Sequence, residues 1–345
     1  MDVVALPTGS PARSLEWSDE HLVDLIGGFR RWRAEGGSLV REIGQSFGGL
    51  VDSLVVSPSG RYRALFARRG TKALLLEDHT LLRELDRSFA HAEDFDYPIA
   101  FGKLPDGREV LAHCPESIGR LRIEDVATGE ILAEQPDPGN SYFHSRLAFS
   151  PDGRHLLVNG WFWHPEATIE VHDVAAALAD PRALDANLLR RKTDGEDPWR
   201  GEVVSACWLG SDTIAVLESP DSFESSEDED EQTRTYDGSN TLTVLDVDGT
   251  LLARNRIAVT PGLLVPCSAS GDNALVLNLH AHPTLLDPAT GQSLSAWPEL
   301  DAGSASHCYG VHDSRHPVYA YDPASRRLAL AQPDHIALIT LPAAA

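Results

Sequence analysis

The amino-acid sequence predicts an all-β protein, and three observations support this prediction. Short apolar segments recur along the chain, and tight polar turns join them in pairs. These turns begin at residues 57, 104, 150, 209, 268 and 322, so they lie 46 to 59 residues apart. The 345 residues, 42% of them hydrophobic, are enough for a large buried core, and a closed all-β fold can hold them in one domain.

The clearest repeat unit spans residues 142–174. Residues 146–149 and 155–158 are expected to be strands, and residues 150–153, with the sequence Ser-Pro-Asp-Gly, are expected to form the turn between them. Proline presets φ in such a turn and glycine permits a positive φ. Residues 168–171 alternate in polarity and predict a third strand.

This unit resembles one repeat of the WD-repeat propellers and their bacterial relatives. The family's repeat has a His before the first strand, a Ser-Pro-Asp-Gly-like turn, and Trp-Asp at the end of the third strand. His144 matches the first feature and Ser150–Gly153 the second, whereas His172 and Asp173 stand where the family has Trp-Asp. The resemblance covers roughly residues 50–342 and implies a β-propeller of four-stranded blades.

We therefore expect a single β-propeller of about six four-stranded blades, with seven as the open alternative. The last unit, residues 318–339, supplies only three strands. An N-terminal strand, residues 39–43, is expected to complete this unit and close the ring, because closure removes exposed sheet edges.

An amphipathic helix is expected over residues 18–35, ahead of the propeller. Its apolar residues repeat with a helical period, Ser18 is a suitable N-cap, and Gly36-Gly37 would end it. The helix would pack on the rim of the propeller or dock a partner. The expected organisation is a tail and helix over residues 1–37, followed by the propeller over residues 38–345. The apolar face of the helix would comprise Leu22, Leu25, Ile26, Phe29 and Trp32.

The chain is strongly acidic, with a net charge of −23. Such a charge repels nucleic acid and anionic membranes, so neither is an expected partner. An acidic loop insertion at residues 220–239 is expected to be a solvated excursion or a tether for a basic partner.

A cytoplasmic location is expected. The N-terminal residues lack the pattern of a secretory signal, and no apolar stretch is long enough to span a bilayer. The four cysteines, at positions 114, 207, 267 and 308, are widely spaced and are expected to be buried, reduced thiols.

Histidines and aromatic residues concentrate in the loops that are expected at one end of the propeller. Ten of the 14 histidines fall in second-to-third strand turns or in connectors between blades, which emerge on the same face. Three roles are open for these histidines. Each could stabilise its own blade, they could form a protein-binding face, or they could build a metal or catalytic centre. The candidate residues of a binding face are His113, His144, Trp161, Trp163, His164, His280, His282, His307, Tyr309, His312 and His335.

His280 and His282 are the candidate metal ligands. Residues two apart on a strand face the same side, so both imidazoles could reach one ion. Zinc or copper would need one or two further ligands from other blades.

The sequence favours a non-catalytic propeller that binds a protein partner through the His- and aromatic-rich face. None of the familiar nucleotide, hydrolase or metalloprotease motifs occurs in it. The alternative is an enzyme or metal-binding protein of lyase, hydrolase or oxidoreductase type, with a His-lined site at the mouth of the central channel. A small-molecule sensor that uses the channel as its pocket is the third hypothesis. No cofactor is indicated, and a divalent metal is the alternative.

Overall fold

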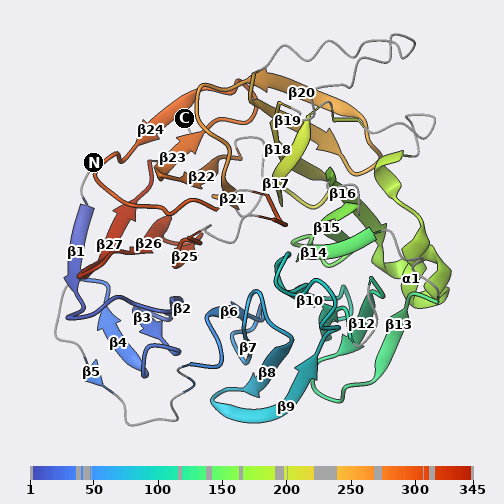
Figure 1. The fold of residues 1–345 in the computed structure, drawn as a ribbon, viewed down its shortest axis with the longest axis horizontal. Helices are drawn as coiled ribbons and strands as arrows, with labels where there is room; N and C mark the ends of the chain where they lie inside the picture. Colours follow the sequence, from blue (N-terminus) through green and yellow to red (C-terminus); the bar gives the residue numbers. More distant parts are fainter. Residues whose placement is uncertain are drawn as a thin grey trace.

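The computed structural model describes residues 3–35, 40–41, 47, 49–115, 119–136, 142–162, 166–190, 198–199, 201–220, 239–267, 274–305, 307–310 and 315–342. Seven antiparallel sheets surround a central axis, each with its first strand near the axis and its last strand at the rim (Figure 1). The protein is a seven-bladed β-propeller. None of the helices within the described residues is long and apolar enough to cross a membrane.

Blades 1 to 3 each contain four strands, which follow one another in sequence. Blade 1 contains β2 (Glu16–Ser18), β3 (His21–Asp24), β4 (Arg30–Arg33) and β5 (Val40–Arg41). Blade 2 contains β6 (Ser53–Val56), β7 (Tyr62–Phe66), β8 (Lys72–Glu77) and β9 (Thr80–Asp86). Blade 3 contains β10 (Ile99–Lys103), β11 (Glu109–His113), β12 (Arg122–Asp125) and β13 (Ile131–Glu134).

Blade 4 has three strands among the described residues, and short helices follow it on the rim (Figure 1). Its strands are β14 (Tyr142–Phe149), β15 (His155–Phe162) and β16 (Glu166–Asp173), followed by α1 (Val174–Ala179) and the 3-10 helices η1 (Pro181–Asp185) and η2 (Leu188–Arg190).

Blades 5 to 7 return to four strands. Blade 5 contains β17 (Glu202–Trp208), β18 (Thr213–Ser219), β19 (Thr241–Asp246) and β20 (Leu251–Arg256). Blade 6 contains β21 (Leu263–Pro266), β22 (Val276–His280), β23 (His282–Leu286) and β24 (Ser293–Ala296). Blade 7 contains β25 (Tyr319–Asp322), β26 (Arg327–Ala331), β27 (His335–Thr340) and, as its outer strand, β1 (Val3–Pro7).

An N-terminal strand closes the ring, as expected, but a different segment provides it. The strand β1 pairs antiparallel with β27, from Val3 opposite Ile339 to Pro7 opposite His335. Leu6 is buried there, which gives β1 an apolar anchor. The segment expected to close the ring contributes β5 instead, which pairs with β4 at the rim of blade 1.

The expected helix over residues 18–35 is wrong, because these residues form most of blade 1. Leu22 and Trp32 lie opposite each other across the β3–β4 hairpin, and both are buried. Phe29 has a φ of 55° and Gly28 a φ of 98°, which no α-helix accommodates. The six units counted from residue 50 onward are blades 2 to 7, and this segment is the seventh.

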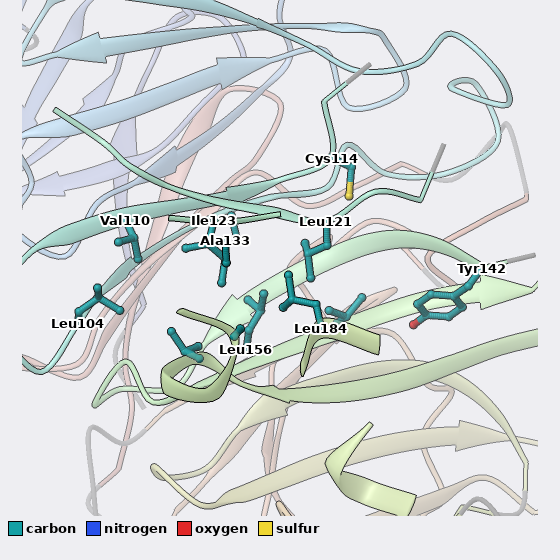
Figure 2. Packing of buried hydrophobic residues seen from close by; sticks show 13 residues of the cluster. Leu104, Val110, Cys114, Leu121, Ile123, Ala133, Tyr142, Leu156 and Leu184 are labelled. Atoms are coloured by element: carbon teal, nitrogen blue, oxygen red, sulfur yellow. The ribbon is translucent and has the colours of Figure 1, made fainter. Parts of the chain in front are cut away.

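Neighbouring blades pack face to face through apolar side chains, and this packing forms the core. Figure 2 shows the layer between blades 3 and 4, where Val110 and Ile123 of one sheet meet Leu156 of the next. Leu184 of η1 joins the same layer. Each fully buried Leu or Ile side chain contributes about 1.5–3 kcal/mol.

The Ser-Pro-Asp-Gly turn of blade 4 forms as expected. The Ser150 hydroxyl accepts a hydrogen bond from the backbone N–H of His155 at 3.0 Å, and Gly153 has a φ of 72°. A Cβ at Gly153 would lie 1.9 Å from the carbonyl oxygen of Lys103, so this turn also needs glycine to pack on blade 3. The four cysteines are free and buried, which confirms the expectation of reduced thiols.

Candidate functional site

A cavity of about 720 Å³ occupies the central channel. All seven blades, or the segments that lead into them, contribute to its wall, which is mostly apolar. The cavity extends to Pro151 and Leu209, which belong to the first turns of blades 4 and 5. We call this the turn end of the channel. Representative wall residues are Leu54, Leu147, Phe149, Leu264 and Val318.

Two connectors cross over the opposite end of the channel. They are residues 87–98, between blades 2 and 3, and the described part of residues 297–318, between blades 6 and 7. Phe95 and Tyr309 form an isolated antiparallel bridge between them. The backbone N–H of Asp96 donates to the carbonyl of Cys308 at 3.2 Å. We call residues 87–97 and 307–310 the plug.

Aromatic rings fill the plug end. The ring centroids of Phe143 and Trp161 are 4.4 Å apart, and those of Trp161 and Tyr309 are 5.2 Å apart, both in stacked geometry. Phe95 and Cys308 are buried in the same cluster. Trp161 and Tyr309, both candidate residues of the binding face, lie side by side in this cluster.

Arg87 holds the first connector in shape. Its buried guanidinium lies over the rings of Phe95 and Tyr97, at 4.5 and 4.9 Å from their centroids. Burial lowers the pKa of Arg87 to about 10, so it stays charged at neutral pH. Its N–H groups donate to the carbonyl oxygens of Arg68, Gly70, Ala92, Phe95 and Asp96.

The plug presents the Asp96 carboxylate, which is 8% exposed, to a group of basic side chains. The Nε of Arg146 donates to Oδ2 of Asp96 at 2.7 Å, and the Nε of Arg69 lies 3.4 Å from Oδ1. Burial disfavours the carboxylate, but the neighbouring arginines, Arg146 foremost, outweigh it and lower the pKa of Asp96 to about 2.

Arg69 and Arg146 also bind the backbone of the plug. Arg69 donates to the carbonyl oxygens of Glu93 and Gly310, at 3.1 and 3.2 Å, and Arg146 donates to that of His307 at 3.0 Å. Both guanidinium groups therefore hold the two connectors together.

Arg68 lines the cavity beside this group. Its side chain makes no hydrogen bond or ion pair with any described residue, although the charges of Asp96 and Asp52 favour its protonated form. Burial lowers its pKa from the usual value near 12.5. Its backbone N–H, in contrast, donates to the Asp52 carboxylate at 2.8 Å. Arg68 is therefore a cation that is held in place by its backbone and has donors free to meet a ligand.

His316 and Tyr319 line the same cavity, and neither side chain hydrogen-bonds to a described residue. Burial lowers the pKa of His316 to about 3, so its imidazole is neutral at pH 7. Burial raises the pKa of Tyr319 to about 12, so its hydroxyl keeps its proton. The channel thus contains the guanidinium of Arg68 and the phenol of Tyr319, neither of them hydrogen-bonded to a described residue, and the imidazole of His316, whose Nε2 lies 3.7 Å from Oδ2 of Asp96.

Two of the histidines expected on the binding face lie inside the blades. The Nε2 of His113 lies 3.3 Å from Glu124, which also pairs with Arg83 of blade 2 at 2.6 Å. The Nε2 of His144 lies 3.4 Å from the side-chain oxygen of Gln135. Burial lowers the pKa of His144 to about 4. Both positions suit a structural role between sheets.

His280 and His282 face each other across a tight turn at Ala281, whose φ is 56°. The Nδ1 of His280 lies 3.3 Å from the carbonyl oxygen of Ala305. His335 begins β27, with its Nδ1 2.7 Å from Asp334. Within the described residues no group of three or more His, Cys, Asp or Glu side chains could hold a metal ion. The metal role of the two histidines stays a prediction.

His307 of the plug joins a polar cluster with residues of blade 5. Its Nε2 lies 3.3 Å from Glu202 and 3.4 Å from the Ser219 hydroxyl. The Tyr309 hydroxyl donates to the same carboxylate. A Ser-His-acid relay needs the acid and the serine on opposite ring nitrogens, whereas here both face Nε2.

Three of the expected binding-face residues, Trp163, His164 and His312, lie outside the described residues, as does residue range 221–238 of the acidic insertion. No motif in the sequence marks Arg68, Arg69, Asp96 or Arg146. The adjacent arginine pair at positions 68 and 69, just after an apolar strand in a chain of net charge −23, is the signal that could have pointed to this site.

No protein-family model and no curated protein matches the chain. Among solved structures, the chain is similar to the crystal structure of the computationally designed Ika8 protein, with a TM-score of 0.55 and 13% sequence identity. The match covers 98% of each chain. At this identity the similarity supports the fold alone.

Proposed function

We propose that the protein binds a small molecule in its central channel. The observation that carries this proposal is the cavity of about 720 Å³, whose wall includes the polar side chains of Arg68, His316 and Tyr319. Small-molecule sites typically have volumes of about 300–1,000 Å³, with mostly apolar walls and a few polar groups that orient the ligand. The channel has both properties.

The unpaired groups favour a ligand over an empty channel. A buried polar group without a hydrogen bond costs about 1–3 kcal/mol. The Nε2 of His316 is a buried atom without a hydrogen bond, and a bound molecule would recover part of this cost by bonding to it. The half-buried side chains of Arg68 and Tyr319 line the same cavity and would bond to the same molecule. The ligand would enter from the turn end, since the plug covers the other end.

A channel-filling variant tests the proposal. Ala206 of β17 lines the cavity, so Ala206→Phe would place a ring where the ligand lies. The wild-type protein is screened by thermal shift against a library of small organic molecules, and hits are titrated by calorimetry. We expect saturable binding that Ala206→Phe abolishes. Ala324→Phe, in an exposed turn of blade 7, is the matched control and should bind as the wild type does. Equal binding by both variants would overturn the proposal.

A protein-binding scaffold, the function favoured by the sequence, is the second candidate. Phe89, on the first connector, is 84% exposed, which is unusual for an aromatic side chain at a loop tip. Pull-down from native extract with the wild type and with Phe89→Ser tests this role. Identical captured proteins would count against it.

The relationship to WD-repeat proteins and the cytoplasmic location belong to the same proposal. The first rests on the Ser150–Gly153 turn and its repeated spacing. The second is supported by four free, buried thiols, which suit a reducing compartment.

A further inference from the structure

We propose that the ligand of the channel is an organic anion with one acidic head group and an apolar body, and that Arg68 binds the head group. This inference rests on the proposed function and adds the chemical class of the ligand. Three observations support it: the charges in the channel that are already paired, the hydrogen-bond donors that remain, and the apolar wall around these donors.

Of the described arginines that line the cavity, one makes no hydrogen bond or ion pair through its guanidinium. Arg69 and Arg146 are paired with Asp96 and with plug carbonyls. Asp52 accepts hydrogen bonds from the backbone of Arg68 and from the Ser53 hydroxyl, both at 2.8 Å. Arg13, which also lines the cavity, donates to the carbonyl oxygen of Val51 at 3.1 Å. The Arg68 guanidinium has no such bond to a described residue, so it is the cation that an anionic group of a ligand would meet.

The remaining groups donate hydrogen bonds. A guanidinium carries N–H donors in a planar fork and no acceptor, and it suits a carboxylate or sulfonate through two parallel bonds. The Tyr319 hydroxyl adds an O–H donor in the same cavity. A cationic ligand would be repelled by Arg68, and a neutral one would leave the Arg68 guanidinium without an ion-pair partner.

The apolar wall of the cavity favours an amphipathic molecule over an inorganic ion. Leu147, Phe149 and Val318 line the cavity, and Pro151 and Leu209 extend this apolar surface to the turn end. An inorganic anion would bury none of this area. A hydrocarbon body gains about 25 cal/mol for each Å² that it removes from water. The head group therefore lies toward the plug and the body toward the turns.

Two fluorescent dyes that differ in one group provide the test. Anilinonaphthalene sulfonate carries the anionic head, and N-phenylnaphthylamine is the same ring system without it. A charge-assisted hydrogen-bonded contact contributes about 1.5–3 kcal/mol, so we expect the sulfonate to bind at least about tenfold more tightly in fluorescence titrations. Ala206→Phe should abolish the binding of both dyes, which locates them in the channel.

Arg68→Gln should lower the affinity for the sulfonate by about tenfold or more and leave the affinity for the neutral dye within about twofold. Retained binding of the neutral dye shows that the channel is intact. Arg108→Gln is the matched control: it removes the same charge from the turn of blade 3, where Arg108 is exposed and pairs with Asp106 at 2.7 Å. It should leave both affinities unchanged.

The outcomes separate this inference from the proposed function. If neither dye shows binding that Ala206→Phe removes, the proposed function fails. If both dyes bind there equally and Arg68→Gln changes neither, the channel is a pocket but the anionic class is wrong. Displacement of the sulfonate by millimolar inorganic phosphate would overturn the requirement for an apolar body. If Arg68→Gln loses both dyes, Arg68→Lys decides: restored sulfonate binding supports the inference, and continued loss overturns it.

Discussion

The two ends of the channel differ in composition and in what they do. The plug end collects aromatic rings, histidines and arginines, and these groups mostly bind one another. The turn end is built from short Ser-, Pro-, Asp- and Gly-containing turns, and the cavity extends to it. The plug end, which is rich in aromatic, histidine and arginine side chains, is the end that the connectors cover. Concentrated aromatic and ionisable side chains can therefore mark the place where a channel is sealed, whereas the polar groups left without partners mark the site.

The largest effect is expected from breaking the plug at Arg87. Arg87→Ala would leave five carbonyl oxygens without their donor and remove two cation–π contacts. We expect unfolding in urea to show a loss of about 4 kcal/mol or more. Arg108→Ala, in an exposed turn, should change stability by no more than about 0.5 kcal/mol. Similar losses for the two variants would remove the distinction between the ends.

Acid should destabilise the protein by a few kcal/mol through two buried histidines near the plug. His144 and His316 have pKa values of about 4 and about 3 in the folded protein, against 6.5 when unfolded. The unfolded state therefore binds more protons below pH 6.5, so stability falls as the pH drops from 6.5 toward 4. Asp96 acts only at lower pH, since its pKa falls from 3.8 to about 2 on folding.

Urea unfolding at a series of pH values measures this effect. The double variant with His144→Gln and His316→Gln should lose most of the slope of stability between pH 6.5 and pH 4. A wild-type protein whose stability does not change over that range would contradict the burial of neutral imidazoles at this end.

Asp96→Asn tests the charge at the plug end separately from its packing, because it removes one negative charge and keeps the plug in place. It leaves Arg69 and Arg146 without their carboxylate, so we expect a loss of about 2–3 kcal/mol in stability. It also makes the floor of the channel more positive, so the anionic dye should bind more tightly in fluorescence titrations. Weaker binding of the anionic dye, with the neutral dye unaffected, would be inconsistent with an electrostatic role for this cluster.

The smallest effect is expected at the turn end. Ser150→Ala removes the acceptor for the backbone N–H of His155, and we expect a loss of about 1 kcal/mol in thermal or urea unfolding. Dye binding should be unchanged, because the Ser150 side chain bonds within its own turn. A loss of dye binding would mean that this turn shapes the mouth of the channel.

The sequence predicts six of the seven blades because their turns repeat in kind and spacing. Blade 1 lacks that turn, and its buried residues imitate a helical period. Leu22 and Trp32 belong to facing strands, whereas Leu25, Ile26 and Phe29 pack on blade 2. The spacing of apolar residues along a sequence cannot distinguish one face of a helix from a β-hairpin whose turn is also buried.

The candidate site was predictable only in part. The sequence brings Trp161, Tyr309 and His307 to one end, and the structure places them together. Whether they open or close the channel depends on the contact between Phe95 and Tyr309, which lie far apart in the chain. The unpaired state of Arg68 likewise depends on every neighbour that the fold supplies, and no local pattern encodes it.

The pairing of β1 with β27 has a kinetic consequence. Its two strands are far apart in the sequence, with Val3 opposite Ile339, so the ring stays open on the ribosome until β27 has been synthesised. From then until its own β1 docks, β27 offers a free edge that any copy of β1 can occupy. At high concentration a neighbouring molecule's first strand competes for that edge, and strand-exchanged dimers are the expected by-product of crowded refolding.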